Sequence, residues 1–342
     1  MRAALFPTPG EIEIVERETP TPAEWHVVVR VEACGVCGTD LHIFQGEFPA
    51  RFPLIPGHEF AGVVEQAGQG VSALRPGDRV VIDPNMNCAS CRPCQRGLTH
   101  LCRNLIAIGV SADGGFATHC SLPARQAYKM PADMSFEVGA MAEPVACCVH
   151  GIERAQIRPG EVVVLLGAGL IGLVMLQLAL LRGVSVAIVS EPDAEKRAMA
   201  TAFGAAETVD PTTQDLTEVV HKETGGSGAD VVIDCVGGAQ TSQQAVGLAG
   251  EGARVLLFGV APPDAEIRVK PYDIYAREIV ITGSFINPFT HGAALRLLAS
   301  GRVKVSEIIS HRMALDDVPK AIEMLAARQA RKIIVEPQRE EG

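Results

Sequence analysis

Residues 162–172 read VVVLLGAGLIG, and this stretch decides the fold of the second half of the chain. Its apolar, β-branched start predicts a buried strand, and the glycines that follow have the spacing GxGxxG. The first glycine permits a tight turn, the second lets the backbone approach a pyrophosphate, and the third lets a helix pack on the strand. The pattern predicts a dinucleotide-binding unit with the phosphates at a helix N-terminus. The predicted phosphate-binding residues are Gly167, Gly169, Leu170, Ile171 and Gly172.

An acidic residue follows at the distance that such a unit requires. Glu191 lies 19 residues beyond Gly172, just after the predicted strand Val184–Val189. A carboxylate there accepts hydrogen bonds from the ribose hydroxyls and repels a 2′-phosphate, which favours NAD over NADP. Lys196, a further predicted cofactor-binding residue, and the neighbouring Arg197 weaken that exclusion because they are cationic.

Downstream of this unit, predicted strands continue to alternate with predicted helices. Compact apolar runs are separated by Ala- and Leu-rich stretches of helix length, which predicts a parallel sheet with helices on both faces. A second glycine cluster, residues 225–228, is not placed between a strand and a helix start and is interpreted as a turn. Near the end of the chain we expect a helix over Val318–Ala330 and a strand over Lys332–Glu336. The first 150 residues instead contain short apolar runs bounded by Gly, Pro and Asp, which predicts a β-rich domain.

Composition limits the possible functions. A chain of 342 residues is long enough for about two domains. Its formal net charge of -10 and its few aromatic residues argue against a nucleic-acid partner. The start of the chain has no long apolar segment typical of a signal peptide. The uncharged run Val162–Leu181 is divided by glycines into a strand, a turn and a helix, so we expect no membrane partner and a cytoplasmic protein.

Four of the ten cysteines lie close together. Cys88, Cys91, Cys94 and Cys102 have the spacing CxxCxxCx7C within 15 residues, which suits a structural zinc site with four thiolate ligands. The spacing argues against an iron–sulfur cluster of the bacterial ferredoxin type. Such a cluster would need three residues before the last cysteine and a proline after it, whereas seven residues lie between Cys94 and Cys102 here. Because four thiolates leave no open coordination position, this site is expected to stabilise the fold without taking part in catalysis.

Two other segments carry metal-binding residue types. One is Cys37-Gly38-Thr39-Asp40-Leu41-His42 and the other is Gly57-His58-Glu59. A catalytic zinc site needs three protein ligands and one free position, and Cys with His suits that metal. Taken alone, Cys37 could equally be a core thiol and His58 a loop histidine with ordinary hydrogen-bond partners.

These motifs, with Gly77-Asp78-Arg79-Val80, occur in the order seen in zinc-dependent medium-chain alcohol and polyol dehydrogenases, and the chain resembles that family over nearly its whole length. The resemblance implies an α/β protein with a GroES-like β-rich catalytic domain and a Rossmann doubly wound parallel sheet. The catalytic domain would comprise residues 1–150 and 287–342, with a structural zinc lobe at about 84–105. The Rossmann domain would comprise residues 151–286.

The resemblance also implies roles for individual residues. Cys37 and His58 would bind the catalytic zinc, and Glu143 in the segment Met141-Ala142-Glu143-Pro144 would be the third ligand, as in sorbitol dehydrogenase-like relatives. Glu59 directly follows a ligand and is the alternative, through transient coordination. Zinc would stabilise an alkoxide from which hydride leaves for NAD.

Three further residues complete the implied site. Thr39 would take the hydroxyl proton and relay it through the nicotinamide ribose to His42, which meets solvent. Asp40 would orient His58. The resemblance thus implies two zinc ions per subunit, NAD as cofactor, and a homotetramer or homodimer.

The expected function is oxidation of a secondary alcohol of a polyol to a ketone. An L-threonine 3-dehydrogenase and a 2,3-butanediol dehydrogenase are alternatives within the family, and a non-catalytic nucleotide-binding relative is a remote one. Residues proposed to line the substrate site are neutral or aromatic, without an obvious arginine for a carboxylate, which favours a polyol. They include Phe44, Phe48, Asn85, Phe116 and residues 284–290.

Overall fold

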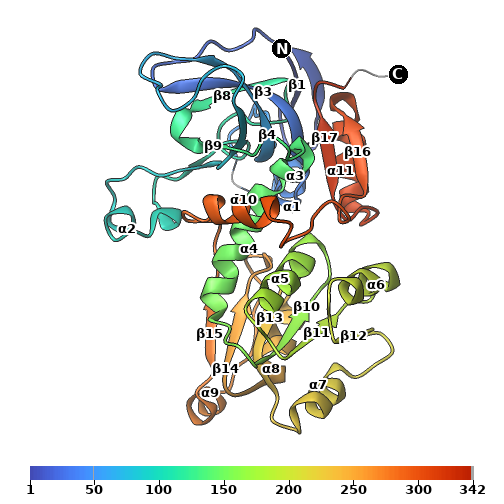
Figure 1. Ribbon diagram of the computed structural model, residues 1–342. Coiled ribbons are helices and arrows are strands. Elements are labelled where there is room, and N and C mark those ends of the chain that lie inside the picture. The colour runs from blue at the N-terminus through green and yellow to red at the C-terminus, as the bar shows by residue number, and fades with distance from the viewer. Residues whose placement is uncertain (49, 340–342) are drawn as a thin grey trace. The chain divides into compact units, whose positions relative to one another are not determined.

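The chain builds two compact units, and the computed structural model describes residues 1–48 and 50–339 (Figure 1). The first unit combines Met1–Ala146 with Pro288–Gly342, and the second is Cys147–Asn287. The chain therefore leaves the first unit, forms the second and returns. The boundary at Ala146 lies within helix α4 (Ala142–Ala155), as does the expected boundary at residue 150.

The second unit contains a six-stranded parallel sheet in the order β12-β11-β10-β13-β14-β15. Its strands are β10 (Val162–Leu166), β11 (Val186–Ser190), β12 (Glu207–Val209), β13 (Ala229–Asp234), β14 (Ala249–Leu257) and β15 (Val280–Gly283). The order of the strands reverses between β10 and β13. Parallel α/β sheets bind their ligands at such a switch point, outside the carboxyl ends of the strands.

Helices cover both faces of this sheet. They are α5 (Leu170–Leu181), α6 (Ala194–Ala202), α7 (Leu216–Thr224), α8 (Ala239–Leu248) and α9 (Pro271–Arg277). Crossovers between parallel strands are right-handed, so α5 and α6 lie on one face and α8 and α9 on the other. The predicted doubly wound sheet is confirmed. The glycine cluster at 225–228 is a turn, since Gly225 ends α7 in the left-handed conformation at φ 60°.

The first unit is built on a seven-stranded sheet with the path β16-β17-β3-β4-β5-β9, on which β8 also pairs with β3. The strands are β3 (His26–Gly35), β4 (Glu59–Ala67), β5 (Arg79–Ile82), β8 (His119–Pro123), β9 (Ala127–Lys129), β16 (His311–Ala314) and β17 (Ile333–Glu336). Two small antiparallel pairs accompany it: β1 (Arg2–Leu5) with β2 (Glu13–Glu16), and β6 (Asn85–Met86) with β7 (Ile106–Ala107).

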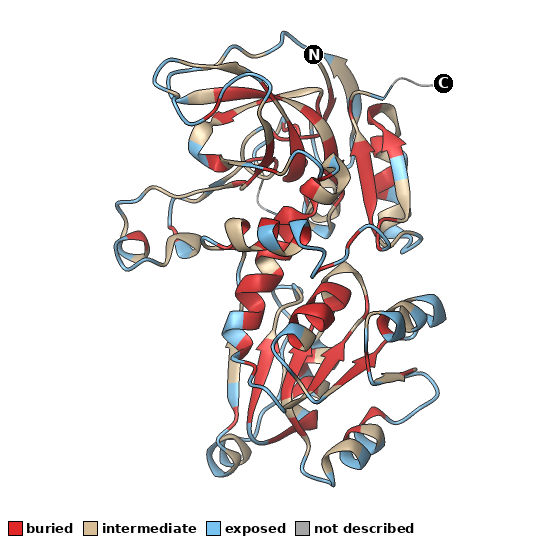
Figure 2. Ribbon diagram, viewed as in Figure 1, coloured by how far each residue is buried: buried red, intermediate tan, exposed pale blue. Residues whose placement is uncertain are grey.

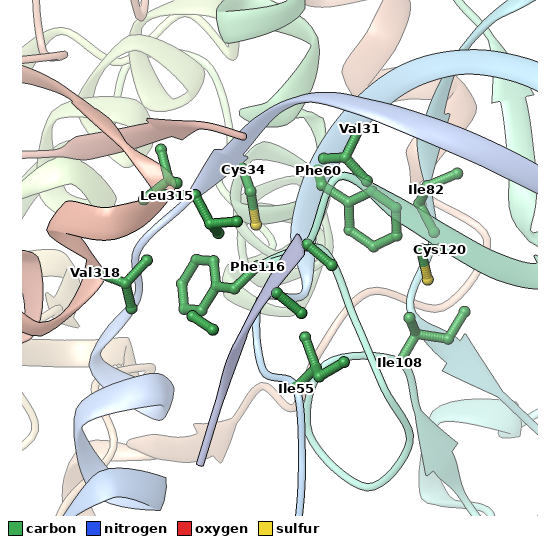
Figure 3. Packing of buried hydrophobic residues seen from close by; sticks show 14 of the residues in the cluster. Val31, Cys34, Ile55, Phe60, Ile82, Ile108, Phe116, Cys120, Leu315 and Val318 are labelled. Atoms are coloured by element: carbon green, nitrogen blue, oxygen red, sulfur yellow. The ribbon is translucent and has the colours of Figure 1, made fainter. Parts of the chain in front are cut away.

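The end of the chain belongs to this first unit by direct pairing. Strand β17 runs antiparallel to β3, with Val335 opposite Cys34. Leu315 and Val318 join the same hydrophobic cluster as Phe116 of the N-terminal part, as Figure 3 shows. The two distant segments therefore share one core, which explains why the chain must return after the second unit is complete.

The remaining helices of the first unit are short. They are α1 (Gly38–Phe44), α2 (Arg92–Gln95), α3 (Phe136–Ala140), α10 (His291–Ala299) and α11 (Val318–Ala326), with 3-10 turns at Thr99–Leu101, Ala124–Gln126 and Leu315–Asp317. The predicted end of the last helix at residue 330 is wrong, because α11 stops at Ala326 and Arg328 has a φ of 55°. A left-handed residue there turns the chain toward β17.

Burial follows the layers of each unit. Figure 2 shows buried residues along most of the strands and in helices α4 and α5. Among the described residues, no helix combines the length and the apolar character needed to span a bilayer.

Candidate functional site

Three predicted residues converge where β3 and β4 meet. Ligand atoms of Cys37, His58 and Glu59 all lie within 4.8 Å of one another. The register places Gly35 opposite Glu59, so the residues just after β3 face those at the start of β4. Gly57 makes this approach possible, because its φ is 92° and a Cβ atom there would lie 2.7 Å from the backbone nitrogen of Phe116. A thiolate, an imidazole and a carboxylate form a donor set that suits zinc.

Asp40 contacts two members of this group through its carboxylate. Its side chain is fully buried, and its Oδ2 accepts a 2.8 Å hydrogen bond from the backbone nitrogen of Cys37. Its Oδ1 lies 3.5 Å from Nδ1 of His58. Burial lowers the pKa of the His58 imidazole, but Asp40 and Cys37 outweigh burial and raise this pKa well above its ordinary value. A proton on Nδ1 facing Asp40 would leave Nε2 to bind a metal.

A buried lysine, not identified from the sequence, completes the charge pattern. Lys332 forms an ion pair with Glu59 and donates a 3.0 Å hydrogen bond to the carbonyl of Val36. Burial disfavours its ammonium charge, yet Glu59 and Cys37 raise the pKa of Lys332 above its usual range. A Cβ atom at Gly35 would lie 2.1 Å from Oε2 of Glu59, so glycine makes room for the pair. The sequence pattern predicts Lys332 only as the first residue of a strand.

The predicted third ligand, Glu143, is a residue of α4. It is buried in the first turn of α4, and its carboxylate is not part of the three-residue group among the described residues. Its coordination of a metal stays a prediction. Glu59, the alternative, is the carboxylate that the structure places beside Cys37 and His58.

The proposed proton-relay residues share one side of α1. Thr39 and His42 are three residues apart, a spacing that places them on one helix face. Oγ1 of Thr39 lies 3.8 Å from Sγ of Cys37, while the half-exposed His42 contacts Oε2 of Glu47 through Nδ1 at 2.7 Å. Thr39 therefore lies beside the metal-ligand group, and His42 lies toward solvent.

The four clustered cysteines also converge. Sγ of Cys91 lies 3.5 Å from that of Cys94, and Sγ of Cys102 lies 3.5 Å from that of Cys88. Hydrogen bonds from Ser90 lower the pKa of the Cys88 thiol to about 5, whereas burial and the adjacent thiols raise that of Cys94 to about 12. Four sulfurs this close cannot all ionise without a cation between them. The set fits a tetrahedral zinc site.

The glycine loop in the second unit fits a dinucleotide. Gly167 has a φ of 95°, and a Cβ atom at Gly172 would lie 1.9 Å from the carbonyl oxygen of Gly167. A Cβ atom at Gly169 would meet nothing within 4 Å, so this position leaves open space at the N-terminus of α5. Leu170 and Ile171 form the first turn of that helix, whose N–H groups have no partner within the helix.

The acid predicted for the ribose is held in place by the backbone. Glu191 is buried; its Oε2 accepts a 2.8 Å hydrogen bond from the nitrogen of Ala168, and its Oε1 accepts one of 3.1 Å from that of Asp193. The carboxylate thus lies beside the glycine loop with lone pairs left for further donors. Lys196 lies in the first turn of α6 and is partly exposed.

Three of the predicted substrate-lining residues are buried in this structure. Phe116 is fully buried in the core of the first unit, and Asn287 is 2% exposed. Thr290 is buried and donates a 2.8 Å hydrogen bond to the carbonyl of Ala146. The lining role of the other predicted residues stays a prediction.

Known protein families and relatives match most of this chain. Residues 23–132 match the family described as alcohol dehydrogenase GroES-like domain, and residues 171–300 match the one described as zinc-binding dehydrogenase. D-arabinitol dehydrogenase 1 of Uromyces fabae is 33% identical over 340 residues, which cover 98% of this chain and 97% of that protein.

The name of one further relative gives another substrate, and the description of a second gives NADP as its bound nucleotide. L-threonine 3-dehydrogenase of Pyrococcus furiosus is 32% identical over 329 residues, which cover 94% of each chain. The structure of a zinc-binding dehydrogenase from Sinorhizobium meliloti 1021 bound to NADP superposes with a TM-score of 0.95 at 42% identity, covering 98% of this chain and 99% of that one.

Proposed function

This chain belongs to the zinc-dependent medium-chain alcohol and polyol dehydrogenases, and from that premise we propose that it oxidises a secondary hydroxyl group of a polyol to a ketone with NAD. The observation that carries the proposal is that Cys37, His58 and Glu59 converge and that His58 contacts Asp40. The relative that acts on D-arabinitol supports a polyol as substrate. L-threonine is the second candidate, because a relative of similar identity acts on it.

Cys37 and His58 would hold the catalytic zinc together with one carboxylate, from Glu143 or from Glu59. One thiolate and one carboxylate carry two negative charges, which balance the charge of the ion. Zinc, when bound, would polarise the substrate hydroxyl, and NAD would accept the hydride. Asp40 would keep His58 in the orientation that presents Nε2 to the metal.

The chain's own residues would remove the proton. The hydroxyl of Thr39, beside Cys37, would accept a hydrogen bond from the substrate hydroxyl and pass its proton outward. His42 would deliver the proton to solvent, and its contact with Glu47 would stabilise the imidazolium that forms. In the second unit, Glu191 would accept hydrogen bonds from the ribose hydroxyls and repel a 2′-phosphate, which supports NAD.

Initial rates with D-arabinitol, D-sorbitol, 2,3-butanediol and L-threonine, each with NAD and NADP, test the proposal directly. Metal analysis of the same preparation should give about two zinc ions per subunit. We expect Cys37→Ala to lose turnover and about one zinc per subunit while it still binds NAD. The matched control is Cys120→Ala, a buried core cysteine, which should keep both metals.

Full turnover by Cys37→Ala would overturn the mechanism. Activity with L-threonine alone would overturn the substrate class. Glu143→Gln and Glu59→Gln, compared for zinc content, decide which carboxylate is the third ligand. The variant that loses the catalytic zinc identifies it.

A further inference from the structure

An arginine beside the predicted ribose site is held by three oxygen atoms. Nη1 of Arg197, in α6, donates hydrogen bonds of 2.7 Å to the carbonyls of Glu191 and Pro192. Its Nη2 lies 3.2 Å from Oδ2 of Asp210. Both charged side chains are about one-fifth exposed, at 20% and 21%, so solvent only partly screens the pair.

The position of this arginine matters because of the carbonyls that it contacts. They belong to the loop directly after β11, where the Glu191 carboxylate is expected to meet the ribose 2′-hydroxyl. A binding site for NADP needs a cationic side chain at that place, and arginine suits a phosphate because it can donate two parallel hydrogen bonds. The chain therefore carries an arginine close to the expected 2′-position, but its guanidinium already has partners.

Sheet register places Asp210 where it can hold this arginine. Val209, the last residue of β12, pairs with Ser190 of the neighbouring β11 (Figure 1). Asp210 comes next and is itself constrained, since its Oδ1 accepts hydrogen bonds of 3.0 Å from the nitrogen and 2.6 Å from the hydroxyl of Thr212. The carboxylate that pairs with Arg197 is thus a fixed feature of the turn.

We propose that Asp210 is a specificity-determining residue that holds Arg197 away from the 2′-position of the cofactor and so favours NAD over NADP. The inference rests on the proposed nicotinamide-dependent function. While the pair is intact, Arg197 does not offset the negative charge of Glu191 that faces a 2′-phosphate. When the pair is broken, the guanidinium can turn to the phosphate.

Asp210→Asn tests this with little change in shape. Asparagine keeps an oxygen for Thr212 but turns an NH₂ group toward Arg197, which removes the ionic attraction. In the zinc-loaded protein, we expect titration calorimetry to show the Kd for NADP falling by about fivefold in this variant, with the Kd for NAD within about twofold of the wild type. Arg197→Gln in the Asp210→Asn background should abolish the gain.

Asp193→Asn is the matched control. It removes one negative charge from the loop after β11 that Arg197 contacts, and asparagine preserves the N-cap of α6 that Asp193 provides to the nitrogen of Lys196. A gain in NADP affinity equal to that of Asp210→Asn would show that general electrostatics, not release of Arg197, is responsible. Arg197→Gln alone should leave the ratio of the two Kd values within about twofold, because the wild type does not use this side chain.

The outcomes separate the two proposals. If the wild type binds NAD and the ratio of Kd values does not change in Asp210→Asn, the inference about Asp210 is wrong and the proposed function stands. A wild type that already prefers NADP also overturns the inference. If it binds neither nucleotide, the proposed function and the inference both fail.

Discussion

Replacing Lys332 by methionine tests its buried ion pair with Glu59, a member of the metal-ligand group. The side chain of Lys332 is 3% exposed and that of its partner Glu59 is 2% exposed. Methionine fills a similar volume but removes the ammonium, so Glu59 loses this cation and the carbonyl of Val36 loses a donor. Removing one partner of a buried ion pair costs about 3–5 kcal/mol. For a unit of this size that free energy corresponds to a fall in Tm of about 10 °C.

The assay is thermal unfolding of the zinc-loaded protein followed by circular dichroism, in wild type and variants. Lys320→Met provides the control, because Lys320 is an exposed residue of α11 and the substitution is the same. The double variant Lys332→Met/Glu59→Gln should regain at least half of the lost stability, since it removes both charges of this buried pair. A Tm for Lys332→Met within about 2 °C of that for Lys320→Met would refute the reasoning.

Two further predictions concern the cysteine cluster and a buried histidine. Cys91→Ser should lower the metal content by about one zinc per subunit and make residues 84–105 sensitive to protease, as checked by metal analysis and mass spectrometry of the fragments; an unchanged zinc count would contradict the site. Burial lowers the pKa of His291 to about 4, below its value in an unfolded chain, so its contribution to stability is lost as pH falls from about 6.5 to 4. Burial raises the pKa of the nearby Asp83 to about 6. The contribution of Asp83 to stability therefore changes with pH in the opposite direction, because it is lost as pH rises from about 4 to 6. His291→Gln should therefore lose about 2 kcal/mol less stability than the wild type between pH 7 and pH 5, as urea unfolding at both pH values would show, and an equal loss would show that His291 is not buried as the neutral form.

Local patterns in the sequence predicted the parts of the protein that depend on short stretches of backbone. The strand, turn and helix around Gly167 follow from glycine conformations and apolar runs within a few residues. The cysteine spacing of 88–102 likewise brings its sulfurs together through local turns. Boundaries were less certain, as α11 shows, because a left-handed residue such as Arg328 has no distinct local signal.

Contacts between distant segments were decided by tertiary structure. Lys332 and Glu59 are 273 residues apart, and they meet because β17 pairs with β3 and β3 pairs with β4. The pairing of Arg197 with Asp210 likewise depends on the register of β11 and β12. By itself, the sequence determined the two kinds of domain, the glycine loop and the residue types able to bind metal. Only the folded sheets decided which charges are buried against each other, because a strand's partner and register depend on the whole core rather than on neighbouring residues.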